Sequence, residues 1–198
     1  MRHALRLFIT SFSMILLLPL SAADAYKIDP VHSEVGFKIW HILSKTPGRF
    51  TKFQGTIQLD EKNLSKSSVE VTIDVTSINT DNEGRDKHLR SADFFDVEKF
   101  LTITFKSVGV KDKGSRQVDI TGDFTMHGIT KRITIPATFI GSGPGMRPGT
   151  TVAGFEASLK LNRSDYGIKT YPGVLGEEVE ISINIEAGKV EPKAESNK

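Results

Sequence analysis

Alternation of apolar and polar residues along most of the chain limits its fold more than any other feature. In the first such stretch, Val35, Phe37 and Ile39 are separated by small or charged residues. A β-strand points successive side chains to opposite faces, so a period of two indicates strands with one buried and one solvated face. Eight stretches share the pattern, at residues 35–39, 53–59, 69–75, 101–105, 118–126, 133–139, 155–161 and 179–185. Strands of a parallel α/β sheet are apolar on both faces, so the pattern excludes that class.

Eight strands with one apolar face each must close into a barrel or form a sandwich to bury that face. Turn sequences separate most of the stretches, for example at residues 112–114 and 141–145. Residues 162–167 also fit a turn, in which Gly167 takes a positive φ, better than an ion pair at the barrel rim. We therefore expect an all-β protein, and a single eight-stranded antiparallel barrel rather than a sandwich. Such a barrel is either filled by its own side chains or holds one small ligand.

The connection at residues 80–96 breaks the alternation. Thr80 and Glu83 fit a capping box in which Thr80 is the N-cap. This pattern predicts a short helix over about residues 81–89, followed by Phe94-Phe95 lying across one end of the barrel. The alternative is a solvated connection whose two phenylalanines only plug the core.

The first 25 residues have the pattern of a cleaved signal peptide. Arg2 and Arg6 precede an apolar stretch at residues 7–20, which is 14 residues long, whereas a membrane-spanning helix needs roughly 20. Ala23-Asp24-Ala25 then supplies a small-x-small cleavage site, which favours cleavage over an uncleaved membrane anchor. We expect an exported, soluble protein with one domain over residues 26–187, no membrane span after cleavage, and a flexible charged tail over residues 188–198.

Composition and motif spacing exclude several kinds of chemistry. The chain has no cysteine, which rules out disulfides, thiolate metal sites and a cysteine nucleophile. A formal charge of +2 without a basic run does not indicate a nucleic-acid partner. The histidines after residue 25 show no metal-ligand spacing, and no nucleophile elbow or phosphate-binding loop is present. We therefore expect no catalytic residue, no metal and no cofactor.

The apolar positions of the alternating stretches are the candidate ligand-binding residues. They include many phenylalanines and branched aliphatic residues and few polar atoms, as the lining of a lipid pocket requires. The set comprises Phe37, Ile39, Phe53, Ile57, Val71, Ile73, Phe105, Phe124, Ile133, Ile135, Phe155, Ala157, Leu159, Ile181 and Ile183.

A series of motifs in one order resembles the YceI-like family. The motifs are YKIDPVHSEVGF at residues 26–37, GRF at 48–50, FQG at 53–55, RDKHLRSADFFD at 85–96, ITF at 103–105, GDFTMHGITK at 122–131 and NRSDYG at 162–167. Together they extend over nearly all of the chain that follows the expected signal peptide.

This resemblance implies a lipocalin-like antiparallel barrel in the bacterial periplasm, with a polyisoprenoid or similar long-chain amphiphile bound in its cavity. The resemblance favours a carrier that sequesters such a lipid, and it leaves a homodimer open. Two other classes of function stay open at this point. One is an enzyme that modifies a lipid or isoprenoid, with His127 or His32 as base, and the other is a solid-cored stress-response or interaction protein without a ligand.

The signal-peptide interpretation predicts a defined N-terminus. Because signal peptidase reads small residues before the cut, protein recovered from the periplasmic fraction should begin at Tyr26, as measured by intact mass. Full-length protein recovered in washed membranes would contradict this prediction.

Overall fold

The computed structural model describes residues 23–191, and these residues form one antiparallel sheet with a single α-helix. The expected signal peptide therefore lies largely outside the described residues, at 1–22, and so does most of the expected tail, at 192–198. The strands are β1 (Asp24–Ile28), β2 (Glu34–His41), β3 (Ser44–Phe50), β4 (Phe53–Leu59), β5 (Ser68–Asp74), β6 (Ile78–Asn79), β7 (Thr102–Gly114), β8 (Gln117–Met126), β9 (Ile129–Pro144), β10 (Thr151–Asn162) and β11 (Leu175–Lys189). The helix is α1 (Glu83–Arg90), and short 3₁₀ turns lie at Leu64–Lys66, Val75–Ser77 and Arg163–Tyr166. No helix among residues 23–191 is long and apolar enough to cross a bilayer.

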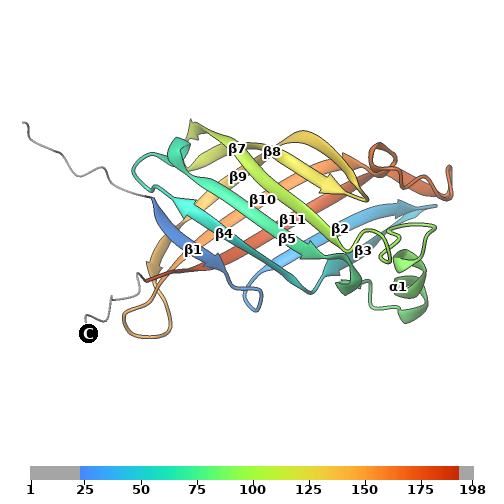
Figure 1. Cartoon of the computed structure of the whole chain (residues 1–198), viewed down its shortest axis with the longest axis horizontal. Coiled ribbons are helices and arrows are strands. Elements are labelled where there is room, and N and C mark those ends of the chain that lie inside the picture. The colour runs from blue at the N-terminus through green and yellow to red at the C-terminus, as the bar shows by residue number, and fades with distance from the viewer. Residues whose placement is uncertain (1–22, 192–198) are drawn as a thin grey trace, which may run out of the picture.

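The sheet closes on itself through β11, which pairs with β2 along its first part and with β1 along its last part. Strands that follow one another in the chain are neighbours from β7 to β11. The first three strands of the barrel are each interrupted, as β1 and β2, β3 and β4, and β5 and β6, because β1 pairs with β4, β2 with β3, and β3 with β6. The prediction of an eight-stranded antiparallel barrel is therefore confirmed (Figure 1).

The interruption between β1 and β2 is held against β11 by a compact set of hydrogen bonds at Glu186. The backbone N–H of Asp29 donates to the carbonyl of Glu186 at 2.9 Å. The hydroxyl of Ser33 donates to the same carbonyl at 3.2 Å and accepts from the N–H of Glu186 at 3.0 Å. Asp29 also accepts from the N–H of Val31, and its other carboxylate oxygen lies 2.9 Å from Nδ1 of His32. Side chains thus replace the strand ladder where the chain bends.

Both expected domain limits fall inside strands. β1 begins at Asp24, which pairs with Leu59 and forms a 2.7 Å ion pair with Lys189. Cleavage after Ala25 would leave β1 with its last three residues. At the other limit, Gly188 and Lys189 pair with β1 and so belong to the barrel rather than to the tail.

Helix α1 begins two residues later than predicted, and its N-cap is Asn82 instead of Thr80. The side chain of Asn82 accepts from the backbone N–H of Arg85 at 2.9 Å. Thr80 makes other bonds: its N–H and its hydroxyl both donate to the buried carboxylate of Asp86, at 2.8 and 2.6 Å, and the hydroxyl accepts from Nε of Arg85. Asp81 has a φ of +58° and turns the chain between Thr80 and the start of α1.

Tyr26, on β1, is buried inside the barrel. It is 1% exposed and belongs to the same buried cluster as Ala153, Ala187 and Leu59. Burial raises the pKa of the Tyr26 hydroxyl above its usual value.

The turn at residues 162–167 is confirmed, with Gly167 at φ +81°. An ion pair at the rim is present as well, between Lys131 and Asp165 at 3.0 Å. Asn162 makes no capping bond. Within this turn, Arg163 is 3% exposed, and its side chain is directed toward the segment that precedes β11.

Arg163 should be one of the main stabilising residues of this segment. It donates to the carbonyls of Ile168, Thr170 and Gly176 at 3.1, 2.7 and 2.9 Å, and to the carboxylate of Glu177 at 3.0 Å. Arg163→Ala leaves buried carbonyls unpaired, so we expect the free energy of unfolding to fall by about 3–5 kcal/mol. Urea denaturation of the variant and the wild type measures this difference in the free energy of unfolding. Glu177→Gln is the control, because Glu177 is half exposed and its loss should cost less than about 1 kcal/mol. Equal effects of both changes would contradict this role.

The Asp29–His32 pair predicts a pH-dependent contribution to stability. Hydrogen bonding to Asp29 raises the pKa of His32, and the same bond lowers the pKa of Asp29. The histidine contribution is fully present below its ordinary pKa of about 6.5 and is lost as pH rises through its folded value. The carboxylate contribution is lost as pH falls through the lowered pKa of Asp29.

NMR titration of the ring protons of His32 tests this assignment. Asp29→Asn should lower the pKa of His32, and Glu70→Gln, which alters an exposed carboxylate paired with Lys106 elsewhere on the barrel, should not. An unchanged pKa of His32 in Asp29→Asn would show that the pair is not formed in solution.

Candidate ligand-binding site

A cavity of about 560 Å³ occupies the interior of the barrel. Its lining comes from inward-facing residues of the strands and from α1 and the connection that follows it. A volume of this size is in the range of pockets that enclose a small molecule. The interior is therefore hollow, which argues against a solid-cored barrel.

Fourteen of the fifteen candidate residues line this cavity, on the inward faces that the alternation predicted. They are Phe37, Ile39, Ile57, Val71, Ile73, Phe105, Phe124, Ile133, Ile135, Phe155, Ala157, Leu159, Ile181 and Ile183. Phe53 does not reach the cavity. It is the first residue of β4 after the interruption that follows β3, and it is 7% exposed within the buried cluster.

Two glycines keep aromatic rings close to the wall of the barrel. A Cβ atom at Gly48 would lie 2.3 Å from the ring of Phe37, and one at Gly122 would lie 2.5 Å from the ring of Phe105. Each ring thus occupies the space that a side chain at the glycine would fill. Because the rings lie over glycine, they extend less far into the interior and leave space for a ligand.

Other lining residues were missing from the prediction for two different reasons. Ile103, Ile120 and Leu161 lie on the same inward faces as the candidates and could have been included by the alternation alone. Leu89 and Phe94, on α1 and just after it, also line the cavity. Their positions follow from how the 80–96 connection folds over the barrel end, and no strand periodicity indicates them.

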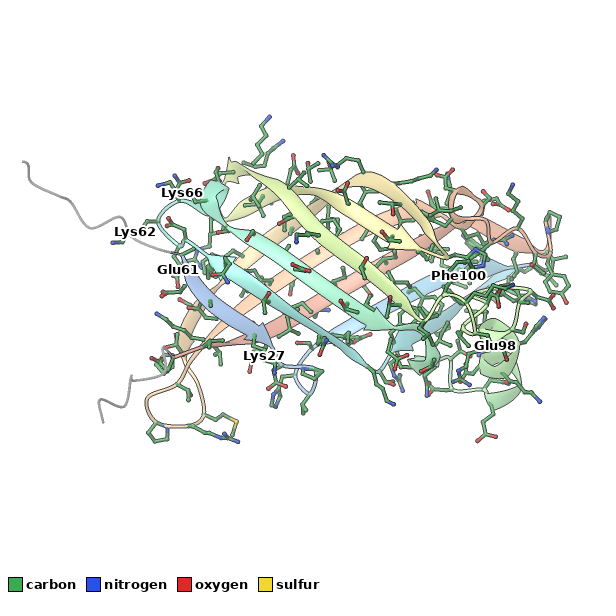
Figure 2. All side chains as sticks on the ribbon, viewed as in Figure 1. Lys27, Glu61, Lys62, Lys66, Glu98 and Phe100 are labelled. Atoms are coloured by element: carbon green, nitrogen blue, oxygen red, sulfur yellow. The ribbon has the colours of Figure 1, made fainter. Side chains whose placement is uncertain are left out.

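The cavity reaches the surface at the end of the barrel where α1 lies. Lining residues there remain exposed, including His41, Arg85, Tyr171 and Val174. Figure 2 shows Glu98 and Phe100 at this end and Glu61, Lys62 and Lys66 at the opposite one. We call this opening at the α1 end the mouth.

Polar groups at the mouth are largely bound to one another. Nε and Nη2 of Arg85 donate to the hydroxyl and carbonyl of Thr80, both at 2.7 Å. Nε2 of His88 lies 3.0 Å from a carboxylate oxygen of Asp93, and its ring packs edge-on against Phe94 at 5.1 Å between centroids. These contacts fix the connection over the barrel end and leave the deeper part of the site apolar.

Neither histidine proposed as a catalytic base lines the cavity. His32 lies outside the barrel beside Asp29, and the ring of His127 packs on Phe100, with Nδ1 3.0 Å from the carbonyl of Tyr166. A base must reach the proton that it removes. The geometry of His32 and His127 therefore offers no support for a lipid-modifying enzyme.

One group among the described residues brings possible metal ligands together, although the sequence spacing indicated none. Oxygen or nitrogen atoms of Asp29, His32 and Glu186 lie within 4.8 Å of one another. Glu186 is distant in the sequence, so only the fold places it there. The three side chains are partly exposed, lie outside the cavity and bind one another or the backbone. These bonds explain why the three side chains lie together without a metal ion.

Solved structures share this fold. The YCEI protein of Campylobacter jejuni superposes with a TM-score of 0.70 and 31% identity, covering 82% of this chain and 96% of that chain. A structure described as a polyisoprenoid binding domain from Saccharophagus degradans superposes with a TM-score of 0.65, covering 84% of this chain and 99% of that chain. At 16% identity, this second likeness is one of fold alone.

The sequence comparisons agree with the structural ones. A UPF0312 protein of Vibrio parahaemolyticus is 41% identical over 189 residues, which are 92% of this chain and 97% of that protein. Protein YceI of Escherichia coli O157:H7 is 45% identical over 168 residues, or 83% and 86% of the two chains. Residues 26–187 match the YceI-like domain. The chain therefore belongs to the YceI-like family.

Proposed function

We propose that this protein binds one polyisoprenoid or similar long-chain amphiphilic lipid inside the barrel and carries it through the periplasm. The observation that carries the proposal is the cavity of about 560 Å³, lined mainly by apolar side chains and open at the mouth. An apolar chain would lie along the barrel axis, with its polar end toward water at the mouth.

The apolar lining favours a long chain over a short one. Each buried CH₂ group contributes about 0.8 kcal/mol, whereas association costs roughly 4–15 kcal/mol. A chain of about ten carbons therefore gains about 8 kcal/mol, which lies within the cost of association. A chain of about 20 carbons gains about 16 kcal/mol, which exceeds the cost of association over most of its range.

The fold supports the same proposal. A structure with this fold is described as a polyisoprenoid binding domain, and its barrel superposes on the one that encloses the cavity here. The signal-peptide pattern at residues 1–25 supports the periplasmic part of the proposal. A carrier needs no catalytic group, which fits the positions of His32 and His127 outside the cavity.

Ala157→Trp tests whether the cavity holds the ligand. Ala157 faces the interior between Phe155 and Leu159 and lies opposite Ala137 on β9. In a hollow barrel, the indole should take the place of part of the lipid. We expect the variant to fold, to lose at least about nine-tenths of any co-purified lipid, and to melt at or above the temperature of delipidated wild-type protein. Lipid extraction with mass spectrometry and thermal melts measure these outcomes.

Ser158→Trp is the matched control, because its side chain points outward from the next position of β10. It should retain the lipid content of the wild type. If the interior were filled, Ala157→Trp would instead cost roughly 1–3 kcal/mol, which corresponds to a fall in melting temperature of roughly 2–12 °C. That fall, together with a wild-type protein free of lipid, would refute the carrier proposal.

A further inference from the structure

Exposed apolar side chains gather at the mouth of the cavity. Leu43 is 89% exposed and Ile42 66% exposed at the tip of the β2–β3 hairpin, and Trp40 precedes them. Tyr171 and Val174, in the loop before β11, are 48% and 42% exposed. We call these five residues the apolar rim. They come from the β2–β3 hairpin and the loop before β11, at one end of the barrel (Figure 1), whereas isolated exposed apolar residues elsewhere need no explanation.

The two loops of the apolar rim are bonded to each other. The N–H of Ile42 donates to the carbonyl of Val174 at 3.0 Å, and His41 pairs with Leu175 in the sheet. Arg163 holds the second loop through the carbonyls of Thr170 and Gly176. The two segments that carry the apolar rim are therefore held against each other by backbone hydrogen bonds.

Ile42 occupies this position at a conformational cost. Its φ is +53°, in the left-handed region, which glycine and asparagine tolerate and β-branched residues rarely adopt. An exposed, strained isoleucine gains nothing from burial within the barrel. Such a residue at a hairpin tip points to a role that requires an apolar side chain there.

The apolar rim is continuous with the cavity. Tyr171 and Val174 line the cavity and remain exposed, so apolar surface extends from the interior to the tip of the mouth. The ammonium group of Lys45 lies 5.4 Å from the centre of the Trp40 ring and 2.6 Å from the carboxylate of Glu180. Tryptophan and tyrosine, each with an apolar body and a polar end, and lysine beside them are the residue types that lie at the boundary of lipid and water.

We propose that the apolar rim docks on the surface of a lipid bilayer, so that lipid passes between the membrane and the cavity without crossing water. The inference rests on the proposed function, because it explains how a long chain enters the barrel. The apolar rim protrudes and continues the apolar lining of the cavity. A bilayer can accept such a tip because its disordered acyl chains adapt to the shape of what is inserted. A second copy of the chain or another protein is the competing occupant, and the experiment separates these.

Transfer of a fluorescent isoprenoid alcohol tests the docking step. Retinol is placed in vesicles of phosphatidylethanolamine and phosphatidylglycerol, and its arrival in the purified protein is followed by fluorescence. We expect the transfer rate to rise in proportion to vesicle concentration, as a collision requires. Leu43→Lys should slow transfer by about tenfold or more, since it places a charge where an apolar group must enter lipid. The equilibrium affinity for retinol added from solvent should change by less than about twofold.

Two further variants separate docking from structural effects. Ile42→Asn relieves the left-handed strain, so it should keep or raise the melting temperature and still slow the transfer. Met146→Lys is the matched control, because Met146 is 98% exposed in the loop between β9 and β10 at the opposite end of the barrel. It should transfer retinol at the wild-type rate.

Flotation of the protein with retinol-free vesicles tests docking without any cargo. Wild-type protein and Met146→Lys should float with the vesicles, and Leu43→Lys should not. A transfer rate independent of vesicle concentration, or equal rates for Leu43→Lys and Met146→Lys, would overturn the proposal. So would a wild-type dimer that Leu43→Lys converts to monomer without any change in flotation. Wild-type protein that floats but binds no retinol and yields no lipid on extraction would overturn the carrier function instead.

Discussion

Closure of the sheet through β11 is the interaction on which the rest of this structure depends. β11 is long enough to pair with β2 and then with β1, so the two ends of the sheet are joined and the strands form a ring. The number and tilt of the strands in such a ring set its diameter, independently of the volume of the enclosed side chains. Space inside is therefore a consequence of closure, and the inward side chains decide only whether that space is filled.

The inward side chains fill only part of the barrel. Tyr26 is buried in one cluster with Ala153 and Ala187. In the middle, Ala137 and Ala157 are neighbours on β9 and β10, and Phe37 lies over Gly48. An empty space of this kind costs stability in an ordinary core because its lining lacks contacts. Here the strand pairings of the barrel stabilise the fold without those contacts, which leaves the apolar lining available to a ligand.

Much of this arrangement could be predicted from local sequence, and the mouth could not. Period-two alternation assigns each strand residue to one face, so inward residues such as Phe155 and Ile183 follow directly from their spacing. The interruptions of the first three strands leave no such mark, because side-chain bonds like those of Ser33 to Glu186 connect residues far apart in sequence. The N-cap prediction failed for a different reason: the N–H and hydroxyl of Thr80 both donate to the buried carboxylate of Asp86, and Asn82 caps the helix instead.

The positions of the polar groups determine which features of a lipid such a site can distinguish. At the mouth, Arg85 is bound to Thr80 and His88 lies beside Asp93, so the protein itself already supplies partners for these groups. A lipid head group there would meet water and an exposed rim. Strong polar selectivity usually arises when the wrong ligand leaves a buried donor or acceptor of the protein unpaired. A head group at the mouth would not meet such a buried group. Each methylene in the apolar interior contributes only about 0.8 kcal/mol. Under the proposed function, selection therefore rests on the length of the apolar chain that the barrel accommodates, and lipids with different head groups and similar chains compete for the same site.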